Sequence, residues 1–131
     1  MTSIAAATLY VGLFALWMLC LKANVGRVRV REKIAFGDGG NAALQRAIRV
    51  QGNAVEDVPV VLAGLIALGV MGAPVLWVHG LGAAFLLGRV LHAVGLSGSA
   101  GGSPGRSLGT LLSALVQLGI AGACVWMALS A

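Results

Sequence analysis

The sequence predicts an all-α integral membrane protein, a four-helix bundle forming one domain over residues 1–131. The first observation is composition, since mean hydropathy is +0.95 and 59% of the residues are hydrophobic. A soluble domain of this length could not bury so much apolar surface. The second observation is that charged side chains are absent from three long stretches, residues 1–21, 58–88 and 107–131.

These stretches predict where the helices lie, because a helix that crosses a bilayer needs about 20 apolar residues. The first and last stretches supply one helix each. The middle stretch is too long for a single crossing, and Pro74 predicts a turn that divides it. The predicted helices therefore cover about residues 2–24, 41–72, 75–96 and 106–130. An even number of crossings places both termini on the same side.

Two connections are rich in turn-forming residues. Residues 36–41, FGDGGN, predict a turn in which Gly40 or Asn41 caps the second helix. Residues 95–106, GLSGSAGGSPGR, predict a linker with Pro104 and Gly105 placed to start the fourth helix. The many glycines allow helices to approach closely in lipid. One of their spacings is a GxxxG pair at 105 and 109, which so glycine-rich a chain produces easily by chance.

Positive charge gathers in one connection and predicts the orientation. The first connection and the start of the second helix carry Lys22, Arg27, Arg29, Arg31, Lys33, Arg46 and Arg49. By the positive-inside rule this side faces the cytoplasm, so both termini are predicted on the non-cytoplasmic side. The segment VGRVRVREK can also contact anionic lipid headgroups. Nucleic acid is not a predicted partner, because the basic segments carry no interleaved aromatic residues.

The sequence also bears on whether the chain has a cleaved signal peptide, a disulfide bond or a metal site. A cleaved signal peptide is disfavoured, because the positive charges follow the first apolar run instead of preceding it. Cys20 and Cys124 are the only cysteines, and the predicted topology sends them to opposite ends of the bundle. Neither an intrasubunit disulfide nor a metal site is therefore predicted.

The segment RAIRVQGNAVEDVP, residues 46–59, places charge at the start of an apolar helix. At about 100° per residue, its polar side chains fall within an arc of roughly 100°. The helix thus has one wet face, formed by Arg46, Arg49, Asn53, Glu56 and Asp57.

Depth in the bilayer predicts which residues meet this face. Glu56 lies about 25 Å from the outer end of the second helix, and His92 lies about 25 Å from the outer end of the third. Arg89 is one turn deeper than His92. All of these side chains are therefore expected at one level, just beneath the cytoplasmic boundary of a hydrocarbon core about 30 Å thick.

Charged groups at this level cost several kcal/mol unless they are paired or wetted, and two interpretations follow. In the structural one, Arg89 pairs with Glu56 or Asp57, while Arg46 and Arg49 extend to lipid headgroups. In the functional one, the arginines outnumber the acids and leave positive charge for an anionic ligand. The converging donors favour the functional interpretation.

A family resemblance is carried by the same residues. The pattern R-x-x-R-x-x-x-N-x-x-E-x-x-P begins at Arg46, GRVLHAVG follows at residues 88–95, and Arg106 opens the fourth helix. Together they resemble the MAPEG family, the membrane-associated proteins in eicosanoid and glutathione metabolism. The R-x-x-H-x-x-G form at Arg89 and His92 is more similar to the bacterial branch, which implies a bacterial inner membrane.

The resemblance implies a homotrimer that binds glutathione between subunits near the cytoplasmic side. Residues matching Arg49, Asn53 and Glu56 hold the tripeptide in glutathione-using members, and Arg106 matches an arginine that stabilises the thiolate. Arginines suit the two carboxylates of glutathione, and a carboxylate suits its amino group. The full predicted binding set is Arg46, Arg49, Asn53, Glu56, Asp57 and Arg89, with Arg106 and His92 as candidate catalytic residues and no metal.

The chain departs from the eicosanoid-synthesising branch, which has tyrosines where this chain has Asp57, His92 and Leu96. Asp57 brings a negative charge that the resemblance does not explain. The only tyrosine, Tyr10, is predicted to join Trp77 in an aromatic belt instead.

Three functions are compatible with these observations. The favoured one is a glutathione transferase or peroxidase acting on hydrophobic electrophiles from the bilayer. The second is a non-catalytic MAPEG protein that binds a lipid or thiol. The third is a small proton-coupled exporter that uses Glu56 or Asp57, which the surplus arginines oppose because they repel cations.

Overall fold

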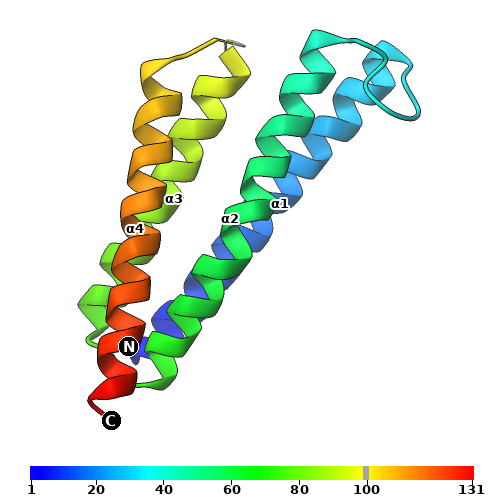
Figure 1. Cartoon of the computed structure of the whole chain (residues 1–131). Coiled ribbons are helices and arrows are strands. Elements are labelled where there is room, and N and C mark those ends of the chain that lie inside the picture. Colours follow the sequence, from blue (N-terminus) through cyan, green and yellow to red (C-terminus); the bar gives the residue numbers. More distant parts are fainter. Residues whose placement is uncertain (99–100) are drawn as a thin grey trace.

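The computed structural model describes residues 1–98 and 101–131. It is entirely helical in this part of the chain, as predicted, and each helix is long and apolar enough to cross a membrane. Figure 1 shows the helices running antiparallel in chain order, with both termini at one end. The helices are α1 (Ser3–Glu32), α2 (Ala42–Val70), α3 (Val75–Gly98) and α4 (Pro104–Leu129).

Helix α1 is longer than predicted, because it ends at Glu32 instead of about residue 24. The basic segment contains no proline, so nothing in it stops the helix before Lys33. Lys33 takes a left-handed conformation with φ 56°, and its N–H bonds to the carbonyls of Arg29 and Val30. A helix of 30 residues is about 45 Å long at 1.5 Å per residue. The basic end of α1 therefore extends beyond the hydrocarbon core.

The other helix starts follow the predicted turn residues closely. Asn41, one of the two predicted caps of α2, accepts a hydrogen bond from the Leu44 N–H on its side chain. Pro104 opens α4 as predicted, and the hydroxyl of Ser103 caps it. Helix α3 continues to Gly98, two residues past its predicted end. Part of the predicted linker, residues 99 and 100, lies outside the described residues.

The turn between α2 and α3 is tied to the start of the chain. Gly72 adopts φ 75°, which glycine tolerates at no steric cost. The Ala73 N–H bonds back to the carbonyl of Leu68, and the Ser3 hydroxyl donates to the carbonyl of Ala73. This contact fixes the N-terminus of α1 beside the predicted turn at Pro74.

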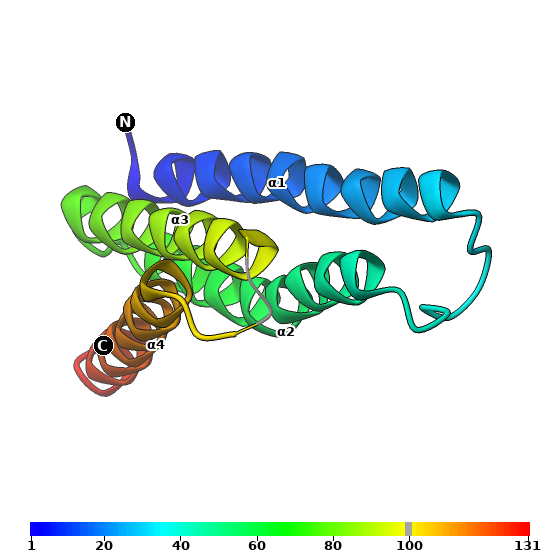
Figure 2. The same ribbon diagram turned by 90° about the horizontal axis from the view of Figure 1, so that it is seen from above.

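The helices pack as two hairpins, α1 with α2 and α3 with α4. Helices α2 and α3 each contact all three other helices, whereas α1 and α4 do not contact each other in the described residues. Figures 1 and 2 show the result, in which the hairpins spread apart toward the end opposite the termini and α4 lies on the far side from α1. No direct contact between α1 and α4 in the described part of the chain therefore closes the bundle on the side where these two helices lie.

Glycines set the close approach of α3 and α4. A Cβ on Gly109 would lie 2.5 Å from the Gly88 carbonyl oxygen and from the backbone nitrogen of His92. A Cβ on Gly95 would lie 2.4 Å from the backbone nitrogen of Arg106. No side chain fits at these positions. Gly109 belongs to the GxxxG pair, so this spacing has a packing role, and it brings the start of α4 against His92.

The core lies between the two hairpins and includes contacts between aromatic rings of α1 and α3. Phe14 and Phe85 are fully buried, with ring centroids 5.2 Å apart. Tyr10 is also buried, and its hydroxyl donates to the carbonyl of His79 at 3.1 Å. Its predicted place in an aromatic belt is wrong, because Gly82 leaves room for the ring inside the bundle. Trp77, by contrast, is exposed.

Candidate functional site

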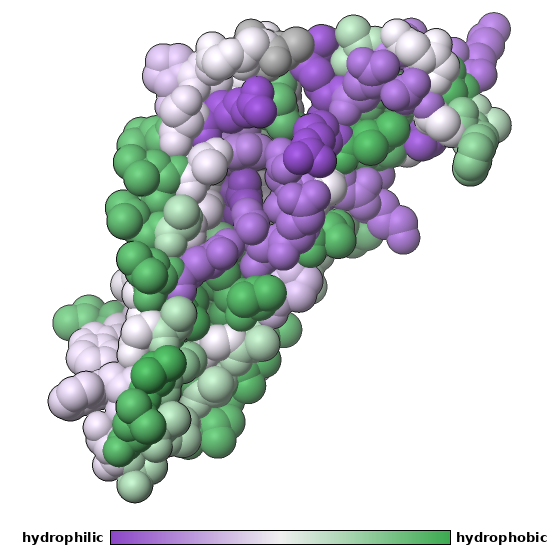
Figure 3. Space-filling view, in the orientation of Figure 1, coloured by the Kyte–Doolittle hydropathy of each residue, from purple (hydrophilic) through white to green (hydrophobic). Residues whose placement is uncertain are grey.

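A polar cavity of about 280 Å³ opens between α2, α3 and α4, toward the end opposite the termini. Figure 3 shows hydrophilic side chains gathered in this upper half of the molecule, above a largely hydrophobic lower half. The cavity contains every predicted site residue except Arg46, together with one residue that was not predicted. Its lining is Arg49, Asn53, Glu56, Asp57, Arg89, His92, Arg106 and Thr110.

The α2 wall is formed by side chains three or four residues apart. This spacing places Arg49, Asn53, Glu56 and Asp57 on one face of the helix. The adjacent face is buried in the core through Val50, Ala54, Val58 and Val61, which fixes the rotation of the helix. Pro59 lies inside α2 and has no N–H to donate to the carbonyl one turn earlier, so the Val55 carbonyl lacks its usual helical partner.

Asp57 forms an ion pair with Arg89 across the α2–α3 interface. The Arg89 Nη1 donates to the Asp57 carboxylate, and the Arg89 side chain is only 3% exposed. The guanidinium also lies 6.0 Å from the centroid of the Phe85 ring. The structure thus selects Asp57 from the two partners predicted for Arg89. It also explains an acid that the sequence pattern left without a role.

Arg49 and Glu56 form a second, looser pair at the mouth of the cavity. Their closest atoms are 3.7 Å apart, and each side chain is 63% exposed. Exposed pairs of this kind contribute little, about 0–1 kcal/mol. Both groups are therefore accessible to a ligand that carries opposite charges.

Helix α4 contributes its N-terminal turns to the cavity. Arg106 lies in the first turn, where its N–H bonds to the Ser103 hydroxyl at 3.2 Å. Thr110 follows one turn later and donates to the Arg106 carbonyl at 2.9 Å. The positive end of the helix dipole adds to the Arg106 charge. Thr110 could have been found from the sequence, because it lies four residues after Arg106 on the same helix face.

His92 and Arg46 differ in their relation to the cavity. His92 lines it but is buried where Gly109 of α4 approaches its backbone. Arg46 lies outside it, in a separate hollow whose lining includes Asn24 and Val28 of α1. Arg46 is one turn nearer the start of α2 than Arg49, and at that level α1 is the closer neighbour.

The cavity carries more positive than negative charge. Its lining includes three arginines and two carboxylates, which leaves one positive charge when histidine is neutral. Because Asp57 is occupied by Arg89, the groups open to a ligand are mainly Arg49, Glu56 and Arg106. This arrangement suits a zwitterion with surplus negative charge.

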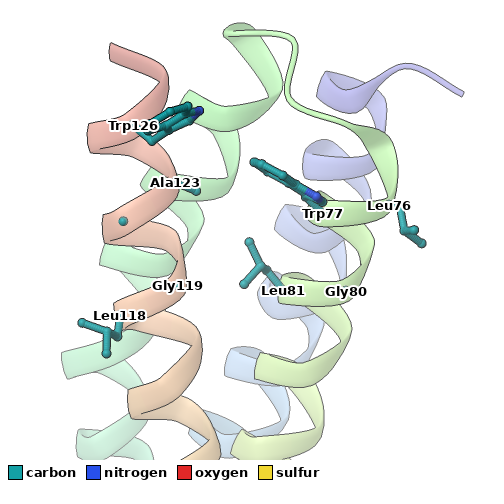
Figure 4. Close-up of a pocket in the computed structure, with 9 residues that line it drawn as sticks. Leu76, Trp77, Gly80, Leu81, Leu118, Gly119, Ala123 and Trp126 are labelled. Atoms are coloured by element: carbon teal, nitrogen blue, oxygen red, sulfur yellow. The ribbon is translucent and has the colours of Figure 1, made fainter. Parts of the chain in front are cut away.

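A second hollow lies near the end of the molecule that carries the termini. It is an apolar groove of about 710 Å³ between α3 and α4, and Figure 4 shows Trp77 and Trp126 near its end with Leu81 between the helices. Trp77 is separated from Arg89 by about 18 Å of helix. The groove is therefore distinct from the polar cavity. It is lined by Leu76, Trp77, Gly80, Leu81, Leu118, Gly119, Gly122, Ala123 and Trp126.

Comparison with known proteins identifies relatives over most of the chain. The sequence model of the MAPEG family matches residues 7–126. Inner membrane protein YecN of Escherichia coli K12 is 38% identical over 89 residues, which cover 68% of each chain. The uncharacterized protein sll1147 of Synechocystis is 32% identical over 127 residues, covering 95% of this chain and 92% of that one. No solved structure matches.

The family match covers α2 and α3, most of α1 and α4, and every residue that lines the polar cavity. It agrees with the resemblance in the RxxRxxxNxxExxP pattern and with the four helices of membrane-spanning length. The chain therefore belongs to the MAPEG family and is an integral membrane protein with four helices.

Proposed function

We propose that this protein is a glutathione-dependent transferase or peroxidase of a bacterial inner membrane, acting on hydrophobic electrophiles. The observation that carries the proposal is the polar cavity, which offers Arg49, Glu56 and Arg106 from two helices within one hollow. The inner-membrane location is supported by the name of the Escherichia coli relative.

The charges of glutathione match this set of groups. The tripeptide has two carboxylates and one ammonium group, so it carries surplus negative charge at neutral pH. Arg49 suits a carboxylate and Glu56 suits the ammonium. Their mutual pair is exposed and loose, so exchanging it for pairs with the ligand costs little. Asn53 lies between them on the same face of α2 and supplies an amide for the peptide groups.

Arg106 is proposed to stabilise the sulfur as a thiolate. A guanidinium at the start of a helix adds its charge to that of the helix dipole, and both favour an anion. The thiol proton passes to water, and the sulfur lone pair attacks the electrophilic carbon. A carbon–sulfur bond forms as the leaving group departs with its electron pair. Positioning and electrostatic stabilisation are the whole contribution of the protein.

We infer that one subunit offers only part of the binding site. Pockets for small ligands usually enclose about 300–1,000 Å³, and this cavity has about 280 Å³. We infer that a neighbouring copy completes it in the homotrimer that the family resemblance implies. The exposed leucines of α4, among them Leu108, Leu111 and Leu115, then face either that neighbour or lipid, from which the electrophile enters.

A binding and conjugation experiment tests the proposal. Glutathione should bind the purified protein saturably and conjugate a generic electrophile such as chlorodinitrobenzene. Glu56→Gln should weaken glutathione binding about tenfold or more, because it removes the charge that pairs with the ammonium group. Arg27→Gln, which removes a charge from α1 far from the cavity, should leave binding unchanged. Absence of saturable binding to the unmodified protein would refute the proposal.

A non-catalytic binding protein is the second candidate. It is favoured by the exposed side chains of Arg49 and Glu56, since these can hold a zwitterionic ligand without any reaction at its sulfur. Saturable glutathione binding with no conjugation and no thiolate formation would select it over the enzyme.

A further inference from the structure

We propose that the cytoplasmic end of α1 contains a binding site for one anionic phospholipid. The site is a separate hollow on the polar side of the molecule, of about 510 Å³, lined by Gly26, Arg29, Val30, Lys33, Ile34 and Ala35. It lies on the extension of α1 beyond its predicted end and takes no part in the proposed glutathione site. The two proposals therefore stand or fall separately.

The lining has the two-part chemistry of a phospholipid. Gly26, Arg29, Val30 and Lys33 are three or four residues apart and share one face of α1. Arg29 and Lys33 provide cationic donors for a phosphate, whereas Val30 and Ile34 provide apolar surface for the glycerol and upper acyl chain. Gly26 forms part of the hollow because it has no side chain, and a Cβ there would meet nothing within 4 Å.

Both cations are free of carboxylate partners. The chain has four acidic residues, and within the described residues none lies within ion-pair distance of Arg29 or Lys33. Glu32 binds Arg31 at 2.6 Å and the Asn41 amide at 2.9 Å. Arg29 donates from Nη1 to the carbonyls of Gly37 at 2.7 Å and Ile34 at 3.4 Å, which leaves the N–H groups on its other nitrogens for a phosphate. A complementary charged group that pairs with them therefore comes from outside the described residues.

Position and exposure favour lipid as the source of that charge. Val30 is 81% and Phe36 is 96% exposed beside this basic cluster. Large apolar side chains among cations suit the boundary between headgroups and hydrocarbon better than water. The length of α1 places its last turns at this boundary. A lipid there satisfies both the cations and the apolar surface.

Two substitutions remove the site in different ways, and each introduces a residue that prefers the backbone conformation already present at its position. Lys33→Gly removes the ammonium group at a left-handed position that glycine prefers. Gly26→Leu fills the hollow without changing the charge, in open space and with a better helix former. Arg27→Gln is the matched control, because it removes one positive charge from the same end of α1 but outside this cavity.

Native mass spectrometry of delipidated protein in detergent measures the outcome. The probes are phosphatidylglycerol and phosphatidylcholine with identical acyl chains, supplied in equal amounts. The unmodified protein should retain phosphatidylglycerol in preference. Lys33→Gly should reduce its retention about fivefold, the effect of one cation near a membrane surface. Gly26→Leu should also reduce it, and Arg27→Gln should not.

Three results would overturn the inference. The first is equal retention of the two lipids by the unmodified protein. The second is an equal loss in Arg27→Gln, which would mean that diffuse surface charge, and not a site, attracts the lipid. The third is displacement of the lipid by millimolar inorganic phosphate, which would assign the hollow to a free anion.

Discussion

At the scale of single residues, the two acidic residues of α2, Glu56 and Asp57, have different structural roles. Asp57 neutralises the buried Arg89, and Glu56 stays exposed with Arg49 at the cavity mouth. The sequence predicted that both acids share a face but could not choose between them as partners of Arg89. The choice depends on the rotation of α3 against α2, which its core contacts fix. A helical wheel does not contain that information.

This division predicts unequal costs for removing the two charges. Asp57→Asn should lower the free energy of unfolding by about 1–3 kcal/mol, because it leaves a buried guanidinium without its counter-ion. Glu56→Gln should change it by less than about 0.5 kcal/mol, since exposed pairs contribute little. Thermal unfolding in detergent compares the two variants. An equal cost would contradict the assignment of Asp57 as the structural acid.

At the scale of helices, glycines decide how the polar cavity is assembled. The α3–α4 contact relies on Gly95 and Gly109, where neighbouring backbones leave no space for a Cβ, and on Gly88, where a Cβ would make a tight contact of 3.0 Å with the Ser113 hydroxyl. The GxxxG spacing alone was a weak signal in a chain with 20 glycines. Its packing role is visible only once the facing backbone is known. The prediction for the end of α1 was wrong for a different reason. The basic residues mark where the chain leaves the membrane, but the helix continues through them to Glu32.

A pair of glycine substitutions tests the close packing of α4. Gly109→Ala should destabilise the protein by about 1–3 kcal/mol, as expected for overpacking, because its Cβ would press on the backbone of α3. Gly122→Ala, on the same helix, meets nothing within 4 Å and should leave stability unchanged or slightly raised, because alanine is the better helix former. Thermal unfolding of both variants gives the comparison. A similar loss in the two variants would contradict the assignment of close α3–α4 packing to Gly109, because alanine is the better helix former at both positions.

At the scale of the whole molecule, the two ends of the bundle have opposite character. The end with the termini is apolar and carries the groove between Trp77 and Trp126, whereas the other end carries the polar cavity and the basic turns of α1. The sequence predicted this polarity and the common level of the α2 and α3 side chains, because helix rise and membrane thickness fix depth. The sequence could not predict that Arg46 lies in a hollow beside α1, because that position depends on how far the two hairpins spread apart.

The ionisation of bound glutathione tests the central claim most directly. Thiolate absorbance is recorded while glutathione is added to the purified protein at neutral pH. The signal should saturate with the unmodified protein and be lost in Arg106→Ala, while Arg27→Gln should retain it. Saturable binding without a thiolate signal in the unmodified protein, or a signal unaffected by Arg106→Ala, would contradict the account.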